Sequence, residues 1–219
     1  MSRLVRDVAM HAKKDVKLII SGEDTELDKN VIEEISDPLV HILRNSVDQG
    51  IESPELRLAC NKPIEGTVKL SAYHKGGNII IEIEDDGKGL QKDRILKKAV
   101  DKGLVKEQSA LSDHHIYNLI FSPGLSTAEK VTNISGRGVG MDVVKRNIEK
   151  LRGKVEVASR EGKGSKFIIK LPLTLAIIDG IVVNVGDTKY IIPTVSIEET
   201  LRPKKEEIIT IRNQGEVVN

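Results

Sequence analysis

The chain of 219 residues is long enough for one domain with a sizeable core, or for one domain and part of another. A net charge of +1 and an aromatic content of 2%, with no tryptophan, argue against a nucleic-acid partner, because such partners need a basic surface or aromatic stacking platforms. The single cysteine, Cys60, excludes an internal disulfide, and no apolar run reaches the ~20 residues that span a bilayer, so we expect a cytoplasmic protein without direct membrane insertion.

The first half of the chain carries helical and strand periodicities in alternation. They predict, in chain order, a helix over about 4–14, a strand over 16–20, a helix over 28–49 and strands over 68–72 and 79–83. Pro38 predicts a kink or a join inside the long helix, and Gly50 is expected to end it. Gly76 and Gly77 predict a hairpin turn between the last two strands.

The second half of the chain begins with the same alternation of helical and strand periodicities and becomes strand-like after Pro172. It predicts helices over about 91–102, from 113 onward and over 139–151, followed by strands over 155–157 and 167–171. Residues 120–135 are rich in Ser, Thr, Pro, Gly and Asn, which predicts a long mobile loop with a functional role. After Pro172 the pattern is strand-like as far as 193, and residues 216–219 resemble another strand.

Mixed helices and hairpin-linked strands indicate an α+β fold. We expect a two-layer α/β sandwich in which helices cover one face of a mixed sheet. This domain is expected to occupy residues 1–172. Residues 173–219 are then expected to open a second, all-β domain that is not completed within the chain.

One side of the long helix is polar, because His41, Arg44, Asn45, Asp48 and Gln49 recur at helical spacing. A solvated helix face is one explanation. Two local costs favour a functional one: asparagine is a poor helix former by roughly half a kcal/mol, and an anion near a helix C-terminus opposes the macrodipole. On that alternative, Asn45 offers an amide oxygen to hydrated Mg²⁺, and His41 is the titratable base candidate.

Asp85 follows a row of alternating isoleucines that ends at Ile83. The same alternation aims its carboxylate to the apolar side, where it needs a partner such as the amino group of an adenine. Gly87 and Gly89 would let the backbone approach a flat base closely. The alternative is a simple hairpin turn, but the residues after Leu90 indicate a helix rather than a returning strand.

A glycine-rich segment, Gly136-Arg137-Gly138-Val139-Gly140, leads directly into a predicted helix. The free N–H groups of a helix N-terminus suit a phosphate chain, although such a loop also permits tight packing. Met141 stands where a dinucleotide fingerprint requires its last glycine, and no segment matches the phosphate-binding G-x-x-x-x-G-K-[ST] pattern. Both common nucleotide-binding folds are therefore excluded.

Four elements stand in a fixed order: the polar helix, Asp85-Asp86-Gly87-Lys88-Gly89, Gly136-Arg137-Gly138-Val139-Gly140-Met141 and Gly162-Lys163-Gly164-Ser165. This order resembles the ATP-binding fold shared by gyrase, the heat-shock chaperone ATPases, histidine kinases and mismatch-repair ATPases. Segments 22–28, 41–52, 135–144 and 171–178 are more closely similar to chemotaxis histidine kinases of the CheA type. The resemblance covers nearly the whole chain. It implies transfer of the ATP γ-phosphoryl to a histidine on a separate phosphotransfer domain, in two-component signalling.

The resemblance also implies roles for individual residues. It assigns His41 to the catalytic position near the γ-phosphate, Asn45 to Mg²⁺ and the phosphates, and Asp85 to the adenine. The other residues that it implies to bind the nucleotide are Arg44, Asp48, Gly87, Gly89, Arg94, Phe121, Ser126, Thr127, Gly136, Arg137, Gly138, Val139, Gly140, Met141 and Ser165. Two positions depart from the family, since Gln49 stands where a histidine is common and Arg94 where a lysine reaches the phosphates.

For the C-terminal segment, the resemblance implies the start of an SH3-like domain that binds a CheW-type adaptor and chemoreceptors. It also implies response regulators downstream and a homodimeric full-length protein. The acceptor histidine and the dimerising helices of the family lie outside the matching stretch, so we expect ATP binding without autophosphorylation. Two alternatives stay open: an ATP hydrolase of the gyrase or chaperone type, which His41 in place of a carboxylate base disfavours, and a non-enzymatic module that docks adaptors.

Overall fold

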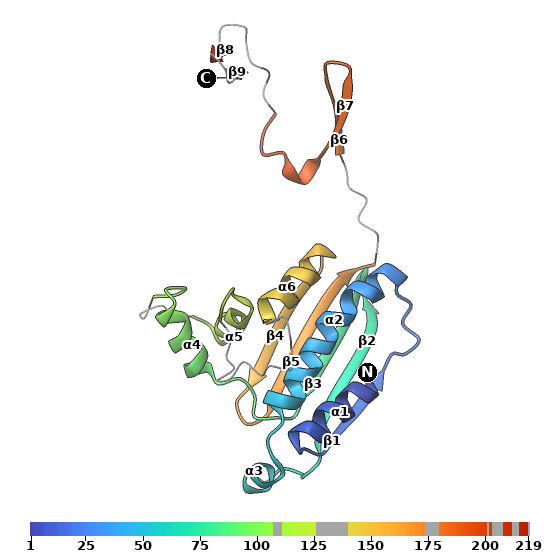
Figure 1. Cartoon of the computed structure of the whole chain (residues 1–219), viewed down its shortest axis with the longest axis vertical. Coiled ribbons are helices and arrows are strands. Elements are labelled where there is room, and N and C mark those ends of the chain that lie inside the picture. The colour runs from blue at the N-terminus through green and yellow to red at the C-terminus, as the bar shows by residue number, and fades with distance from the viewer. Residues whose placement is uncertain are drawn as a thin grey trace. The chain divides into compact units, whose positions relative to one another are not determined.

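The chain folds into two compact units, Met1–Thr174 and Leu175–Asn219. The computed structural model describes residues 1–106, 111–125, 140–173, 180–200, 202, 208–211 and 215–218 (Figure 1). The first unit holds a five-stranded sheet with the order β1-β2-β3-β5-β4. Within the described residues, none of the helices is long and apolar enough to cross a bilayer.

The sheet is mixed. Its strands are β1 (Val16–Ser21), β2 (Gly66–Lys75), β3 (Asn78–Asp85), β5 (Gly164–Pro172) and β4 (Lys154–Arg160). β1 runs parallel to β2, and the other neighbouring pairs are antiparallel. Gly76 and Gly77 form the β2–β3 turn with φ of 58° and 71°, in the left-handed region that glycine adopts without strain. The predicted hairpin is confirmed.

Helices cover one face of this sheet, which confirms the predicted α+β fold. The α-helices are α1 (Ser2–Ala12), α2 (Lys29–Asn45), α3 (Pro54–Ala59), α4 (Lys92–Asp101), α5 (Asp113–Asn118) and α6 (Met141–Lys150). Figure 1 shows α1, α2 and α6 lying over the same face of the sheet. Side-chain caps set the starts of three of them: Asp28 for α2, Ser53 for α3 and Ser112 for α5.

The long helix has no join at Pro38, and its last turns are not α-helical. α2 runs through the buried Pro38 without a break between Lys29 and Asn45. Its expected last turns are instead a π-helix, η1 (Ser46–Gly50). Lys14 caps this end, because its ammonium donates to the carbonyls of Val47 and Asp48, which lie in the last turn and have no partner within it. The predicted helical stretch therefore ends at Gly50 as expected, but its last turns are π-helical and not α-helical.

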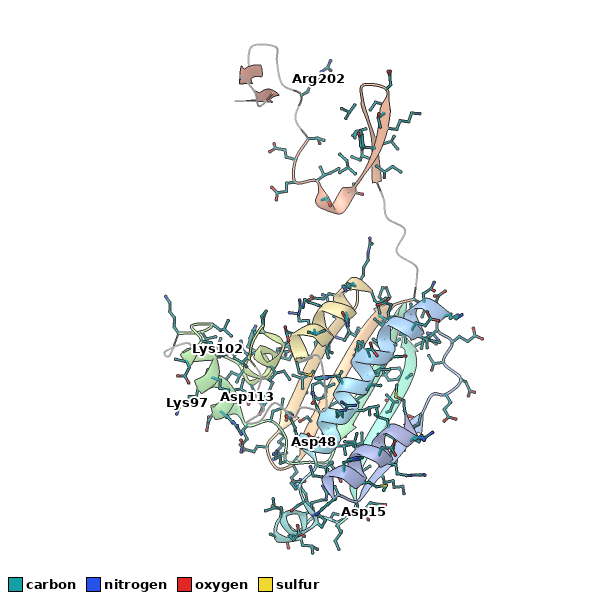
Figure 2. All side chains as sticks on the ribbon, viewed as in Figure 1. Asp15, Asp48, Lys97, Lys102, Asp113 and Arg202 are labelled. Carbon is teal, nitrogen blue, oxygen red and sulfur yellow. The ribbon has the colours of Figure 1, made fainter. Side chains whose placement is uncertain are left out.

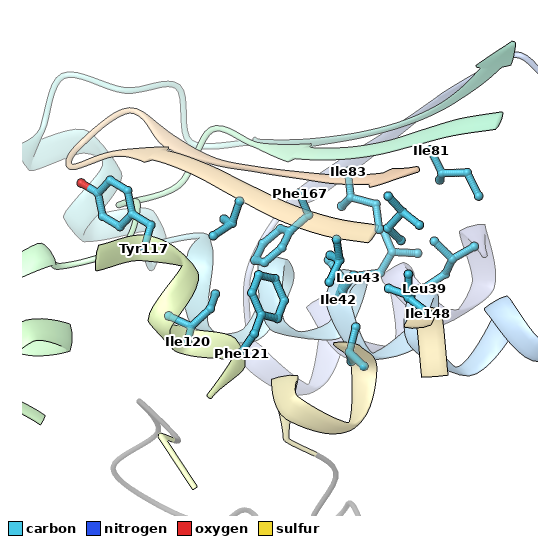
Figure 3. Packing of buried hydrophobic residues seen from close by; sticks show 14 of the residues in the cluster. Leu39, Ile42, Leu43, Ile81, Ile83, Tyr117, Ile120, Phe121, Ile148 and Phe167 are labelled. Carbon is cyan, nitrogen blue, oxygen red and sulfur yellow. The ribbon is translucent and has the colours of Figure 1, made fainter. Parts of the chain in front are cut away.

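The core lies between the sheet and the helices. Alternate residues of β3 and β5 point into it, and α2 and α6 meet them with fully buried side chains (Figure 3). These residues are Ile79, Ile81, Ile83, Phe167, Ile169 and Leu171 from the strands, and Ile42, Leu43 and Ile148 from the helices. Burial of each such side chain stabilises the fold by about 1.5–3 kcal/mol. The other face of the sheet carries ion pairs, such as Lys166 with Glu82 at 2.8 Å.

The start of the expected 120–135 loop belongs to this core. A short 3-10 helix, η2 (Leu119–Phe121), follows α5. Its residues Ile120 and Phe121 are buried, as is Leu125. Phe121 points into the core between helices and sheet in Figure 3. This part of the segment is therefore an anchored element and not a mobile loop; residues 126–135 lie outside the described part.

Two hairpins lie within the described residues of the second unit. β6 (Gly180–Val185) pairs with β7 (Thr188–Pro193), and β8 (Ile208–Ile211) pairs with β9 (Gly215–Val218); a 3-10 helix, η3 (Thr194–Ser196), follows β7. In the first hairpin, the cross-strand pairs Ile181–Ile192 and Val182–Ile191 lie on opposite faces. All four side chains are exposed. The hairpin therefore presents apolar surface on both faces.

Candidate functional site

A buried carboxylate at the end of β3 forms the centre of the site. Asp85 is 4% exposed and continues the row of buried isoleucines, as the alternation predicts. Its Oδ1 accepts hydrogen bonds from the backbone N–H groups of Gly87 (3.0 Å) and Ser165 (3.3 Å). Burial raises the pKa of Asp85 to about 6, although these two bonds and the Ser46 hydroxyl act to lower it.

One oxygen of this carboxylate is available to a ligand. Among the described residues, both hydrogen bonds to the Asp85 side chain go to Oδ1. The buried Ser46 hydroxyl also lacks a hydrogen bond of good geometry within the described part of the chain. A buried polar atom without a partner costs about 1–3 kcal/mol. Among the described residues, Asp85 Oδ2 accepts no hydrogen bond, so the site fits a ligand N–H donor such as the amino group of adenine.

Glycines let three backbone segments converge on Asp85. A Cβ on Gly87 would lie 2.1 Å from the carbonyl oxygen of Gly50, and one on Gly164 would lie 1.9 Å from the carbonyl oxygen of Asp85. At Gly50, a Cβ would lie 3.3 Å from the Asp85 carboxylate. Gly87 is thus required by close packing of the protein backbone, a reason that the sequence pattern does not reveal.

This packing predicts that Gly87→Ala destabilises the fold. The methyl group would push η1 away from the β3 end, at an expected cost of about 2–3 kcal/mol. Urea denaturation measures the loss. Gly103→Ala is the control: Gly103 has a φ of 67° but no atom of the described residues within 4 Å of an added Cβ, so the variant loses only about 1 kcal/mol to backbone strain. Equal losses for the two variants would contradict the packing argument.

The polar stripe of α2 divides into two parts. His41, Arg44 and Asn45 are half-buried, whereas Asp48 and Gln49 in η1 are exposed. Figure 2 shows Asp48 at the end of this helix. Burial lowers the pKa of His41, and the charge of Arg44 lowers it further, so the ring is held neutral at physiological pH.

Asn45 joins the stripe to the start of α6. Its Nδ2 donates to the sulfur of Met141 at 3.4 Å, and Gly140 is the N-cap of that helix. Within the described ranges, no three His, Cys, Asp or Glu side chains cluster as metal ligands. Mg²⁺ is commonly held by one or two protein oxygens together with substrate phosphates and water. The amide oxygen of Asn45 beside a helix N-terminus fits that mode of binding.

The remaining predicted site residues lie in different settings. Ser165 is buried beside Asp85, and Gly89 has a φ of 73°. Arg94 is half-buried on α4, whereas the Phe121 side chain belongs to the hydrophobic core. Ser126, Thr127, Gly136, Arg137, Gly138 and Val139 lie outside the described residues. The sequence did not predict the roles of Ser46 beside Asp85 and of Lys14 at the end of η1, since neither residue belongs to a recognisable sequence pattern.

The family model described as "Histidine kinase-, DNA gyrase B-, and HSP90-like ATPase" matches residues 34–175, which include η1, the Asp85 loop and α6. The chain belongs to this ATPase family. The family predicted from the four motifs is thereby confirmed.

Three relatives are close to this chain in sequence. Chemotaxis protein CheA of Rhizobium meliloti is 49% identical over 95% of the chain, and sensor histidine kinase CheAY of Helicobacter pylori is 53% identical over 95%. Chemotaxis protein CheA of Klebsiella aerogenes is 53% identical over 94%. The chain spans 27%, 26% and 31% of these three proteins, respectively.

Proposed function

We propose that the chain contains the ATP-binding catalytic domain of a cytoplasmic chemotaxis histidine kinase. In this proposal, residues 1–172 bind Mg²⁺–ATP and pass its γ-phosphoryl to a histidine on a separate phosphotransfer domain. The observation that carries the proposal is the buried Asp85, with one carboxylate oxygen open to a donor, inside the segment that matches the ATPase family. The names of the close relatives support the kinase assignment.

Nucleotide binding would use three parts of the site. The adenine amino group donates to Asp85, and the N-terminus of α6 faces the phosphates. Asn45 offers its amide oxygen to Mg²⁺, beside Met141. Bound Mg²⁺ would neutralise charge on the phosphate oxygens. The sequence resemblance adds phosphate contacts from residues 126–127 and 136–139 to this proposal.

The transfer step needs little covalent chemistry from the protein. The bond between the γ-phosphorus and its bridging oxygen breaks, ADP leaves with the electron pair, and an acceptor imidazole nitrogen forms a P–N bond. Catalysis of such a step is mainly positioning and stabilisation of charge. The neutral ring of His41 can accept a proton or a hydrogen bond near the γ-phosphate.

Two measurements test this proposal. Calorimetry with Mg²⁺ and a non-hydrolysable ATP analogue should show saturable binding by the chain. Labelled ATP should then transfer its γ-phosphoryl to an added phosphotransfer domain. A folded chain that does not bind the analogue would refute the proposal. Rapid phosphate release without an acceptor would favour the hydrolase alternative, in which nucleotide drives a conformational change.

His41→Gln should slow transfer about a hundredfold and leave ATP affinity within a few-fold, because general acid–base catalysis contributes at least that much. Since the pKa of His41 is lowered, its own contribution to the rate at saturating ATP should be lost only below the usual histidine range, where the rates of wild type and variant should converge. The pH–rate profile of transfer checks this. Asn30→Ala, an exposed change on the same helix, is the control. A loss in ATP affinity equal to the loss in rate would mean that His41 serves binding alone.

For residues 173–219, the proposal is the start of an SH3-like domain that binds a CheW-type adaptor and chemoreceptors. The β6–β7 hairpin supports it, because a strand pair that is apolar on both faces needs cover from further strands or from a partner. The full-length kinase is proposed to be a homodimer that passes phosphoryl groups to response regulators. Pull-down of a CheW-type adaptor by the full-length protein, lost on deleting this segment, tests the docking role.

A further inference from the structure

A buried ionic network lies directly behind the Asp85 loop. Its centre is Arg57 of α3, which is 1% exposed. The guanidinium donates to the Glu52 carboxylate at 3.1 Å and to both carboxylate oxygens of Asp86 at 3.1 and 2.9 Å. Its Nε donates to the carbonyl oxygen of Pro63 at 2.6 Å. One side chain therefore ties the segment after η1 to the loop after β3.

Lys62 adds a second set of bonds to the same loop. Its ammonium donates to Glu52 Oε1 at 2.7 Å. It also donates to the backbone carbonyl oxygens of Asp86 at 2.9 Å and Gly87 at 2.7 Å. The Asp86 carboxylate is fixed further, because its Oδ1 accepts from the N–H of Thr67 at 2.9 Å. Two cations thus hold consecutive backbone groups of the loop that follows Asp85.

The bonds of Gly87 connect this network to the ligand site. The N–H of Gly87 donates to Asp85 Oδ1, while its carbonyl accepts from Lys62. The next residue is also held, since the N–H of Lys88 donates to the carbonyl of Gly50 at 3.0 Å. The orientation of the Gly87 backbone therefore depends on groups on both sides of the loop.

We infer that Arg57 and Lys62 are positioning residues for base recognition, since they fix the Gly87 backbone whose N–H holds the Asp85 carboxylate. The inference rests on the proposed function, because it concerns how that site selects adenine. In this inference neither side chain needs to contact the ligand, since the bonds of both go to protein groups. They act through the loop, by keeping one carboxylate oxygen bonded and the other directed at the base.

Energetics favour this role over a purely stabilising one. Buried ion pairs are about as stable as apolar side chains of the same volume, because desolvation offsets the Coulomb attraction. Their directional bonds, however, fix geometry as apolar contacts do not.

The deciding variant is Lys62→Met, which keeps the length of the side chain and leaves Glu52 paired with Arg57. Binding of the Mg²⁺–ATP analogue should weaken about tenfold, the loss that corresponds to one hydrogen bond involving a charged group. Affinity for tripolyphosphate, which has no base, should stay within twofold. The preference for ATP over GTP should fall by the same factor as the ATP affinity.

The pH at which ATP binding is half lost distinguishes a positioning role from a merely structural one, because loss of stability alone would not shift it. Asp85 must be ionised to accept from adenine, so binding fails as pH drops. Without a fixed Gly87 N–H, the pKa of Asp85 rises and the midpoint of this loss moves to higher pH. Asp86 is the charged neighbour that acts on Asp85, while η1 and β5 present the uncharged Ser46 and Ser165.

Lys170→Met is the matched control, because it removes an ion pair to Glu156 at 3.0 Å on the open face of the sheet. Arg57→Lys should reproduce the effects of Lys62→Met. If Arg57→Lys fails to fold, Lys62→Met alone tests the inference. Lys62→Met that binds ATP with the affinity and pH midpoint of the control would overturn the inference while the proposed function stands. Absence of binding by the wild-type chain would overturn both.

Discussion

Asp85→Asn is expected to abolish ATP binding and, at neutral pH, to make the free protein more stable. The asparagine oxygen can still accept the two N–H groups that now bond to Oδ1. Its amide nitrogen would replace Oδ2 and face the adenine amino group, donor against donor. A buried site that mispairs a polar group loses at least about a hundredfold in affinity. Calorimetry with the Mg²⁺–ATP analogue measures the loss.

The gain in stability follows from the pKa of the same carboxylate. Folding raises it from 3.8 to about 6, so the folded state favours the protonated form. The stability that this proton provides is present below pH 4 and is lost as pH rises through 6. An asparagine avoids that loss, which amounts to about 1–3 kcal/mol for a shift of this size. Urea denaturation should therefore show the variant to be more stable at pH 7.5 and equal to wild type below pH 4.

Glu84→Gln is the control for this experiment. Glu84 precedes Asp85 on β3 but points to the exposed face of the sheet. Its substitution should change neither ATP binding nor the pH dependence of stability. A gain for Asp85→Asn that persists at pH 4 would mean that burial of the charge is not its cause. Retained ATP binding would remove Asp85 from the site altogether.

Such opposite effects would show that the binding site carries a cost for the fold. The ionised carboxylate lies among buried isoleucines, where it destabilises the free protein and gains its partner when the ligand arrives. Stabilising substitutions that reduce function are common at sites of this kind.

Side-chain alternation explains why the centre of the site was predictable. In a strand, every second residue faces the same side, so the isoleucines of β3 locate Asp85 without any tertiary information. The glycine turn before β3 fixes the hairpin in the same local way. The α+β fold follows because these local patterns leave one apolar face on each element.

Features that depend on contacts distant in sequence were not predictable. The π-helical end of α2 relies on Lys14, more than thirty positions away, to bond its carbonyls. α3 spans only six residues, too few for a clear hydrophobic period, so periodicity did not reveal it, although Ser53 and Pro54 form a helix-start pattern. The partners of Arg57 are scattered between Glu52 and Asp86, so its burial and role emerge only from the structure.

Asn45→Ala should reduce phosphoryl transfer to an added acceptor domain about a thousandfold. The amide nitrogen of Asn45 bonds to the Met141 sulfur, which leaves its oxygen for the metal that accompanies the phosphates. Loss of one preorganised group that stabilises charge costs about 10²–10³ in rate, and weaker metal binding adds to it. Single-turnover transfer from labelled ATP, measured over a series of Mg²⁺ concentrations, checks this.

Two further variants separate metal binding from packing. Asn45→Asp keeps an oxygen ligand of the same size, so transfer should recover at least in part when Mg²⁺ is raised, whereas the alanine variant should stay inactive. Met141→Leu removes the sulfur contact and should lower the rate by less than about tenfold, because a weak neutral bond to sulfur contributes little. Near-normal transfer by Asn45→Ala at every Mg²⁺ concentration would refute the metal assignment. Equal losses for Asn45→Ala and Met141→Leu would instead assign Asn45 to the contact between α2 and α6.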